Sequence, residues 1–375
     1  MLSQENNNKY NVATFAFYNV ENIFDTINSV DLLNKKTQTI ETISLNKAIL
    51  EGADFTKNRI FNQTHNQNLY LKLINNEEFT PKGPRLWNKA RYEKKIEKIS
   101  YVISNIGKEL FHSPPVIVGL SEIENETVLK DLLNSQLLGN YKYNYVHFNS
   151  LDSRGIDCAL IYQSSRFKLI ESKNYRVELI KDQIKEYSRD ILFVSGLLDG
   201  EKISVFVNHW PSRRSGEKLS EAYRIKTATI LATKIKELKE KNAEEKIVIM
   251  GDFNDNPTNK SIKMLNSKPL KENLANEDFY NPMEVLFKKG FGTAAYMDSW
   301  FLFDQFLVSA SLVNEKNMGL YHYHNAGIFD KEFLKTPKGK YKGYPRRSFN
   351  GIIFDEDGFS DHFPVYLNLK RRINN

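Results

Sequence analysis

The chain has 375 residues, a formal net charge of +7, 41% hydrophobic and 26% charged residues, and one cysteine. This composition is ordinary for a soluble globular protein, and the length suffices for a large hydrophobic core. A single cysteine excludes an intrachain disulfide and a cysteine-based zinc cluster. Because no run of about 18 apolar residues occurs, no membrane-spanning helix is predicted.

The net positive charge, with a pI of about 9.0, has two interpretations. It favours acidic partners such as nucleic acid, and it also fits a lysine-rich solvated surface, because the positive charges are scattered along the chain. The N-terminal segment MLSQENNNKY is polar and lacks the apolar core of a signal peptide. The chain as written is therefore expected in the cytoplasm, or outside it if a leader has been removed. We expect a monomer.

The first elements are predicted from composition and periodicity. Residues 1–11 are polar and are predicted to be flexible, whereas β-branched and aromatic residues predict a strand at 12–19. The polar, asparagine-rich segment 26–85 is predicted to be an insertion of irregular structure with one helix near 40–52. Apolar residues at helical spacing predict a helix at 88–110.

The rest of the chain is predicted to consist mainly of strands. Continuous apolar runs at 116–120 and 247–250 indicate strands buried on both faces, and a long amphipathic helix is predicted at 217–240. A short helix is predicted at 125–134, and further strands are predicted at 142–148, 156–163, 166–172, 190–198, 202–208, 302–308 and 363–369. Hairpins outnumber βαβ units, and no linker divides the chain. We therefore expect one α/β domain over 1–375, a four-layered α/β/β/α sandwich of two packed mixed β-sheets flanked by helices.

Polar side chains lie at the ends of several of these apolar strands. They are Asn19, Glu122, Asn208, His209, Asp252, Asn254, Asp304, Asp361 and His362. Burying such groups costs free energy unless they are paired or bind a metal, and convergence on one site at a sheet edge would offset that cost. Taken singly, each has an ordinary explanation: the segment GDFNDNP is typical of a turn, and an Asp-His pair is usually a surface feature.

Together and in order, these segments resemble the endonuclease/exonuclease/phosphatase superfamily. That superfamily includes pancreatic-type deoxyribonucleases, abasic-site endonucleases, neutral sphingomyelinases and inositol-polyphosphate phosphatases. The matching pieces are FYNVEN, GLSEIEN, RGIDCALIY, VNHWPSR, IMGDFND, FDQFLVS and FSDHFPV, which span nearly the whole chain. The segments FYNVENIFD, RLWNKARYEKK and NHWPSRR are similar to a bacterial subgroup. The resemblance implies a divalent-metal-dependent phosphoesterase.

The resemblance also implies a metal site. Glu122 would be the principal ligand, and Asp361 and Asn19 would assist in the metal shell. All three offer oxygen donors, which suit Mg²⁺ or Mn²⁺ and not zinc.

The remaining matched residues would carry out the hydrolysis. Asp252 would orient or deprotonate the attacking water, and Asn254 would hold that water or a phosphate oxygen. His362 would bond the scissile phosphate and be oriented by Asp304, while His209 would face the same phosphate. Such a set supplies a positioned water and stabilises the charge of the leaving group.

Phosphate contacts are expected from Arg154 and Arg213, because guanidinium groups match phosphate geometry, and also from Asn208. Exposed, solvated arginines are the alternative reading. The superfamily often has Asn-x-His at the fourth motif, whereas Asn208 and His209 are adjacent here. The alignment of this motif with the superfamily can therefore be shifted by one residue.

Three functions remain open from the sequence. The first is a phosphodiesterase acting on nucleic acid, as an endonuclease or exonuclease. The second is a phosphatase or phospholipase C-like esterase acting on inositol phosphates or sphingolipids. The third is a non-catalytic phosphate-binding protein. The segment KGKYKGYPRR at 338–347 mixes basic and aromatic residues, which suits a nucleic-acid groove and equally an ordinary extended loop.

Overall fold

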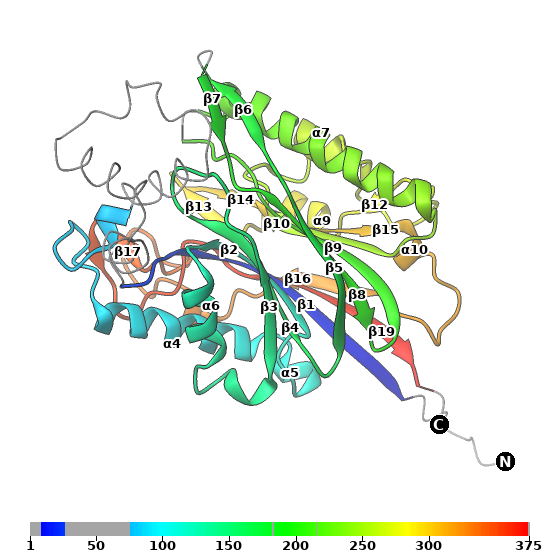
Figure 1. Ribbon diagram of the computed structural model, residues 1–375, viewed down its shortest axis with the longest axis horizontal. Coiled ribbons are helices and arrows are strands. Elements are labelled where there is room, and N and C mark those ends of the chain that lie inside the picture. The colour runs from blue at the N-terminus through cyan, green and yellow to red at the C-terminus, as the bar shows by residue number, and fades with distance from the viewer. Residues whose placement is uncertain (1–8, 27–75, 182–183, 215, 374–375) are drawn as a thin grey trace, which may run out of the picture.

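The computed structural model describes residues 9–26, 76–181, 184–214 and 216–373. Two mixed β-sheets pack against each other, and helices cover their outer faces (Figure 1). This confirms the predicted α/β/β/α sandwich. None of the helices in these four ranges is long and apolar enough to cross a membrane.

The first sheet has six strands. Its order is β16 (His322–Ile328), β19 (Val365–Arg372), β1 (Tyr10–Ile23), β2 (Ile117–Ile123), β4 (Asp157–Gln163) and β3 (Tyr143–His147). Strand β1 is parallel to β2 and antiparallel to β19. The C-terminal ends of β1 and β2 and the start of β19 therefore lie at one edge of the sheet.

The second sheet has seven strands. Its order is β11 (Ser267–Lys268), β12 (Phe279–Tyr280), β15 (Asp304–Ser309), β10 (Ile247–Asp252), β9 (Glu201–His209), β8 (Ile191–Leu198) and β5 (Phe167–Tyr175). Strand β10 is parallel to β9 and antiparallel to β15. The ends of β9 and β10 therefore lie beside the start of β15.

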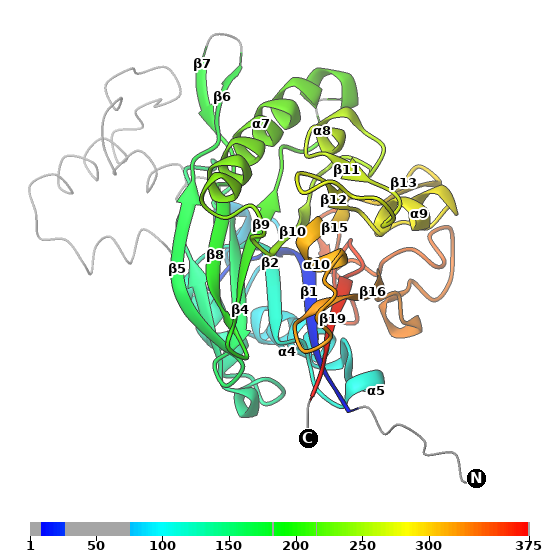
Figure 2. The ribbon, with the colours of Figure 1, turned by 90° about the vertical axis from the view of Figure 1, so that its right-hand side faces the viewer.

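Helices form the two outer layers. On the first sheet lie α4 (Lys89–Asn105) and α6 (Glu126–Leu133), whose apolar side chains share a core with β1, β2 and β4. On the second lie α7 (Glu217–Lys241) and the short α8 (Lys260–Lys263). Helix α7 is on the opposite side of the molecule from α4 and α5 (Lys108–Phe111) in both views (Figure 1, Figure 2).

The smaller elements connect these layers. The short helices are α9 (Met283–Lys288), α10 (Ala310–Val313), η2 (Asn76–Phe79), η3 (Gly139–Tyr141) and η4 (Glu332–Leu334). Three hairpins pair β6 (Glu178–Lys181) with β7 (Ile184–Tyr187), β13 (Ala294–Tyr296) with β14 (Ser299–Phe301), and β17 (Phe349–Asn350) with β18 (Ile353–Phe354).

The central strands are apolar throughout because both of their faces are buried. In β1, Phe15 and Phe17 face the other sheet, while Ala16 and Tyr18 face the helices, as the two-residue period of a strand requires. The sheets approach so closely at Gly119 that a Cβ there would lie 2.6 Å from the sulfur of Met250. This close packing brings the polar strand ends of both sheets together.

Several sequence predictions need correction. Tyr10 and Asn11 were predicted to be flexible, but they begin β1, because they pair with Arg372 and Arg371 of β19. The helix predicted at 88–110 is two helices, α4 and α5, since Gly107 adopts a left-handed conformation with φ 80° between them.

The predicted insertion is only partly covered by the structure. Its segment 27–75, including the helix predicted near 40–52, lies outside the described residues. At the described end, the ring of Phe79 stacks on Phe24 with centroids 4.3 Å apart and meets Trp87 edge-on. Residues 76–87 therefore pack onto the end of β1.

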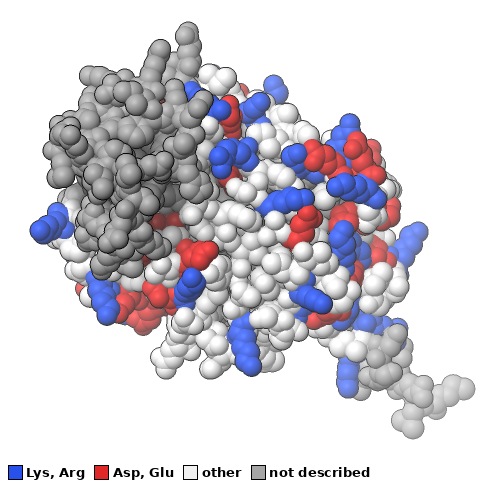
Figure 3. Space-filling view, viewed as in Figure 1, with Lys and Arg blue, Asp and Glu red and all other residues white. Residues whose placement is uncertain are grey.

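The described residues on the face shown in Figure 3 fit the interpretation of scattered charge. On the face shown in Figure 3, lysine and arginine side chains are interspersed with aspartate and glutamate, and no single basic patch dominates that face.

Candidate active site

The candidate site lies where the two sheets meet at one end of the sandwich. Within the second sheet, Asp252 pairs with His209 of β9 and with Asp304 of β15. From the first sheet, Asn19 Nδ2 donates a hydrogen bond of 3.0 Å to Asp252 Oδ2. The convergence of these strand ends thus joins residues that are 233 positions apart.

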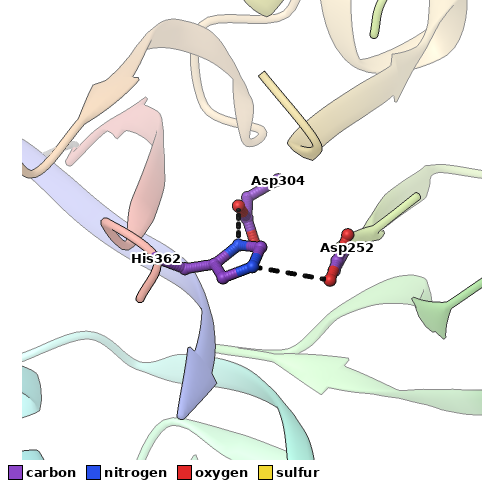
Figure 4. A group of neighbouring side chains, drawn as sticks. All are labelled: Asp252, Asp304 and His362. Atoms are coloured by element: carbon purple, nitrogen blue, oxygen red, sulfur yellow. Dashed lines mark hydrogen bonds and ion pairs between the residues drawn. The ribbon is translucent and has the colours of Figure 1, made fainter. Parts of the chain in front are cut away.

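His362 and Asp304 form a close pair in the site (Figure 4). His362 Nδ1 lies 2.6 Å from Asp304 Oδ2, and its Nε2 lies 4.0 Å from Asp252 Oδ2. The loop that carries His362 is fixed by Ser360, whose Oγ donates to the carbonyl of Asn19 at 2.7 Å and accepts from the His362 backbone N–H at 3.1 Å. The imidazole therefore has a fixed orientation between two carboxylates.

The charges of this pair follow from its surroundings. Burial lowers the pKa of His362, but the carboxylates of Asp304 and Asp252 outweigh it, so that the pKa lies well above its usual value. Burial raises the pKa of the Asp252 carboxyl to about 6, and Asp304 adds to the rise while His362 opposes it. At neutral pH the site therefore holds an imidazolium next to a weakly basic carboxylate.

His209 is a second imidazole of opposite character. Burial, together with the positive charges of Arg189 and Arg154, puts the pKa of His209 well below its usual value, so the ring is neutral. Its Nε2 lies 3.6 Å from Asp252 Oδ2 and 3.8 Å from Glu122 Oε1, whereas its buried Nδ1 has no hydrogen-bond partner among the described residues. The proton therefore belongs on Nε2, which faces the two carboxylates.

The backbone is strained at the site. Glu122, Glu21, Asn22 and Asn254 all have positive φ, at 68°, 52°, 53° and 50°. Glu122 is also the extra residue where the register between β2 and β4 shifts, which turns its side chain out of the strand's regular alternation. Such conformations are unfavourable for residues with a Cβ, and they gather at functional sites.

The residues predicted to bind metal are rich in oxygen donors. Glu122 is buried at the strand end, and Asn19 Oδ1 accepts from the backbone N–H of Glu21 at 3.0 Å. Burial and the nearby charge of Asp361 raise the pKa of the Glu21 carboxyl to about 7, although Lys95 lowers it. Clustered carboxylates with too little positive charge are the environment that a hard divalent cation would relieve, so the donor set fits Mg²⁺ or Mn²⁺.

A second group of possible ligands is less suitable. One ligand atom each of Asp252, Asp304 and His362 lies within 4.8 Å of the others. However, the 2.6 Å between His362 Nδ1 and Asp304 Oδ2 is a hydrogen-bond distance, which leaves no room for an ion between those atoms. We therefore interpret this group as one that handles protons.

The residues predicted to contact phosphate differ in position. Arg154 reaches into the site, where one guanidinium nitrogen lies 3.2 Å from Glu122 Oε1 and 2.9 Å from Asn22 Oδ1. The guanidinium of Arg213 instead bonds the Asn254 carbonyl at 2.7 Å and the Asp255 carboxylate at 2.6 Å. Arg213 thus holds the turn that carries Asn254.

Asn208 and His209 point to different sides of β9. The Asn208 amide donates to the Met250 carbonyl at 3.2 Å and accepts from the Trp210 indole N–H at 3.1 Å, so it is used within its own sheet. Asn254 Nδ2 likewise donates to the Trp210 carbonyl at 3.0 Å. The imidazole of His209 faces the carboxylates, and this sets the register of the motif.

Sequence reasoning missed Lys95, which lies beneath the site. Its side chain is 0% exposed, its Nζ bonds the Phe359 carbonyl at 2.7 Å and also Ser348 Oγ, and it lies 3.7 Å from Glu21 Oε2. The available signal was a lysine four residues before Ile99 on the apolar stripe of the predicted helix. A buried ammonium there supplies positive charge behind the carboxylates.

Comparison with known proteins places this geometry in context. The family model described as "Endonuclease/Exonuclease/phosphatase family" matches residues 61–371. A search of curated proteins gave no significant match.

Solved structures share the fold over nearly the full chain. A mannosyl-6-phosphatase of Bacteroides thetaiotaomicron is 15% identical, with a TM-score of 0.50 over 95% of this chain and 99% of that one. An endonuclease/exonuclease/phosphatase family protein of the same species is 15% identical, with a TM-score of 0.51 over 97% and 100%. A further such protein, from Bacteroides vulgatus, is 13% identical, with a TM-score of 0.50 over 96% and 98%.

Proposed function

The chain belongs to the endonuclease/exonuclease/phosphatase family, whose members are hydrolytic phosphoesterases that generally depend on a divalent metal, and from this premise we propose that it is a phosphodiesterase acting on nucleic acid. The observation that carries the proposal is the arrangement of His362 between Asp304 and Asp252 at the end of the sandwich. In this arrangement Asp252 can accept a proton from water, while the charged imidazole of His362 can donate a hydrogen bond to the phosphate.

We propose that Glu122, Asp361 and Asn19 hold Mg²⁺ or Mn²⁺. The chemistry of the donors and the crowding of carboxylates around Glu21 support this choice. When bound, such an ion supplies positive charge that offsets the charge developing on the phosphate oxygens.

The protein's own residues would act on water and phosphate. Asp252 accepts the proton of the attacking water, and its two carboxylate oxygens are held by Asn19 Nδ2 at 3.0 Å and by the Asn254 backbone N–H at 2.9 Å. The side chain of Asn254 orients that water or a phosphate oxygen. A pKa of about 6 for the Asp252 carboxyl suits a base that works near neutral pH.

Three cationic or neutral donors would face the phosphate. The His362 imidazolium donates from Nε2, because Asp304 holds its Nδ1–H. Neutral His209 donates from its Nε2, and Arg154 offers a guanidinium next to Glu122. Donors fixed in advance by buried partners stabilise the transition state without reorganising during the reaction.

Nucleic acid is proposed as the substrate because the basic, aromatic segment 338–347 lines a pocket that also includes Asp361. A phosphomonoesterase is the second candidate. It is favoured by the similarity, over almost the whole of both chains, to a protein described as a mannosyl-6-phosphatase, although at 15% identity the two share only the fold. We further propose that residues 1–375 act as one domain and as a monomer.

A panel of phosphate esters tests the proposal. Purified protein is assayed with Mg²⁺, Mn²⁺ or EDTA on single-stranded and duplex oligonucleotides, a small phosphodiester, mannose 6-phosphate and inositol phosphates. We expect metal-dependent cleavage of the diesters to be fastest. Faster hydrolysis of a monoester would favour the second candidate, and no hydrolysis of any ester beside an active control nuclease would contradict both.

A further inference from the structure

A pocket of about 340 Å³ lies beside the candidate active site. Asp361, proposed above as a metal ligand, forms part of its wall. The hairpin β13–β14 and the segment between Thr336 and Asn350 form most of the rest. This volume is at the lower end of the range for ligand pockets, about 300–1,000 Å³, and it suits one small building block rather than a duplex.

One side of the pocket is aromatic and apolar. Tyr296, Met297, Tyr341 and Tyr344 line it. Tyr344 is fixed, because its hydroxyl donates to Asp298 Oδ1 at 2.9 Å and its ring meets that of Trp300 with centroids 5.4 Å apart. Tyr344 therefore offers a flat ring surface in a defined position.

The aromatic wall is connected to the catalytic loop. Trp300 stacks on Phe363, the neighbour of His362, with centroids 6.1 Å apart and an interplanar angle of 18°. From the other side of the pocket, the Arg346 carbonyl accepts the backbone N–H of Phe359 at 2.7 Å. A group held in the pocket would thus have a fixed position relative to His362.

The rim of the pocket carries backbone strain. Met297 and Asp298, at the tip of the β13–β14 hairpin, have φ values of 46° and 58°. A two-residue turn with both φ values positive normally contains glycine or asparagine, and methionine is unfavourable there. Met297 is also 77% exposed, so burial does not offset the strain. The two-residue hairpin turn requires these φ values, so the turn fixes the positions of Met297 and Asp298 at the rim.

The pocket also has positive charge that forms no ion pair with a carboxylate of the described residues. Arg346 is paired with Asp355 at 2.9 and 3.0 Å and with Asp357 at 3.0 Å. Arg347 and Lys340, in contrast, are exposed and form no ion pair with any carboxylate in the described ranges. Arg347 lies close enough to the site to lower the pKa of the Glu21 carboxyl. Lys340 Nζ lies 5.6 Å from the centroid of the Tyr341 ring. Since no described carboxylate forms an ion pair with either cation, both can bind an anionic group of the substrate.

We propose that this pocket binds the nucleoside next to the scissile phosphate, with its base against the tyrosine wall and the following phosphate on Arg347 and Lys340. The proposal rests on the phosphodiesterase function proposed above and specifies its substrate as a nucleotide whose base is unstacked. A base can lie on a protein ring only after it leaves its neighbours, so single strands and frayed ends are preferred over the interior of a duplex.

A sugar monophosphate fits the pocket less well. Its one phosphate would be held by the catalytic residues, which would leave Arg347 and Lys340 without an anion. Asp298 and Asp355 also line the pocket, but they are engaged by Tyr344 and Arg346 and need no cationic ligand. The tyrosine rings of the pocket suit a nucleobase, and Arg347 and Lys340 suit the phosphate that follows it.

Three diesters with the same leaving group test the proposal. They are methyl p-nitrophenyl phosphate, the p-nitrophenyl ester of thymidine 5′-phosphate, and that ester with an added 3′-phosphate, each with Mg²⁺. The methyl ester reports the reaction alone. We expect wild-type kcat/KM to rise about ten-fold from the methyl to the thymidine ester, through stacking of the base, and again with the 3′-phosphate.

Two variants and two matched controls locate the effect. Tyr341→Ala removes a ring that is 46% exposed, and Tyr10→Ala removes one that is 43% exposed at the far end of β1. Arg347→Ala removes a free cation, and Lys342→Ala removes one that does not line the pocket. We expect Tyr341→Ala to abolish the preference for thymidine and Arg347→Ala to abolish the gain from the 3′-phosphate, with methyl ester hydrolysis and both controls unchanged.

The outcomes separate the pocket from the reaction. Hydrolysis of the methyl ester without preference for thymidine, or equal losses on all three esters in Tyr341→Ala and Arg347→Ala, would overturn the pocket assignment alone. If no ester is hydrolysed, the phosphodiesterase function fails, and calorimetric binding of thymidine 3′,5′-bisphosphate still tests the pocket. Binding that weakens about ten-fold in Arg347→Ala but not in Lys342→Ala supports the assignment, and equal binding overturns it.

Discussion

Strands β1, β9 and β10 run between two charged ends of the molecule, and the two ends differ in how their carboxylates are neutralised. Away from the site, Asp199 accepts hydrogen bonds from Arg166 at 2.6 Å and from the Tyr321 hydroxyl at 2.6 Å. Burial raises the pKa of the Asp199 carboxyl, but these partners outweigh it and leave the pKa lowered. At the site, burial raises the pKa values of Asp252 and Glu21 to about 6 and 7.

The difference in carboxyl pKa distinguishes the end that stabilises the fold from the end proposed to carry out the reaction. A carboxylate with a lowered pKa stabilises the folded state, whereas a buried one with a raised pKa destabilises it once it is charged. Under the proposed function, the negative charge at the site end would bind a cation and accept a proton. The opposite end has no such task, so its charges are paired. The predictions below alter one end at a time.

The largest effect is expected from removing the imidazolium. His362→Ala should lower kcat for a phosphodiester by roughly 10²–10⁴-fold, because the charged donor to the phosphate is lost. The unfolding midpoint should also fall, because the buried Asp304 carboxylate loses its partner at 2.6 Å, so activity is compared well below the midpoint of the variant. His324→Ala, an exposed histidine on β16, is the matched control and should keep wild-type activity. Full activity in His362→Ala would rule out its assigned role.

The next effect is a change in how stability depends on pH. Because the folded pKa of Asp252, about 6, exceeds its ordinary value of 3.8, the folded state binds more protons between those pH values, and stability falls as pH rises through them. Asp252→Asn lacks this titration. In EDTA, the difference in unfolding free energy, Asp252→Asn minus wild type, should increase by on the order of 1–3 kcal/mol as the pH rises from 4 to 7.

Denaturant unfolding at a series of pH values measures this gain. A difference between Asp252→Asn and wild type that is constant with pH would show that the carboxyl does not titrate abnormally. The same variant should lose activity, because it cannot accept a proton from water.

An effect of similar size and opposite sign is expected at the other end. Asp199→Asn should lower the free energy of unfolding by about 1–3 kcal/mol at pH 7, because the charged hydrogen bonds to Arg166 are lost. The contribution of Asp199 is present above its ordinary pKa of 3.8 and is lost as pH falls through its lower folded pKa. Hydrolytic activity should be unchanged. A loss of activity with no loss of stability would contradict the division between the two ends.

The smallest effect is expected at an exposed ion pair. Glu237 lies 2.6 Å from Lys234 on the solvent side of α7, with 49% of its side chain exposed. Glu237→Gln should change the free energy of unfolding by a few tenths of a kcal/mol, within about 0.5 kcal/mol. It therefore serves as the control for Asp199→Asn in the same denaturation experiment.

The polar residues at the strand ends were predictable from the sequence, whereas their partners were not. The strand ends were predictable because an apolar run that is buried on both faces ends abruptly in a polar residue, as at Asp252. Asp304 was noted near the start of a predicted strand, and its role came from the resemblance. These signals are local, and the order of the motifs then related them to one another.

The remaining features depend on tertiary structure. The burial of Lys95 under Glu21 requires α4 to pack on β1, and the position of Lys95 on the apolar stripe of the helix does not show which carboxylate it faces. Strand β16 was missed because its residues alternate poorly and a register shift at Tyr323 and Asn325 interrupts its pairing with β19. The pocket was missed because its hairpin and its basic loop lie far apart in the sequence, although the mixed basic and aromatic character of 338–347 was noted.

The most direct test of the central claim is metal dependence at Glu122. The initial rate of methyl p-nitrophenyl phosphate hydrolysis is measured for wild type and Glu122→Gln, first in EDTA and then with Mg²⁺ added in steps. We expect the wild-type rate to fall to background in EDTA and to recover with Mg²⁺, while Glu122→Gln needs far more Mg²⁺ or stays at background. A wild-type rate that is unaffected by EDTA, or a Glu122→Gln titration that matches wild type, would contradict the account.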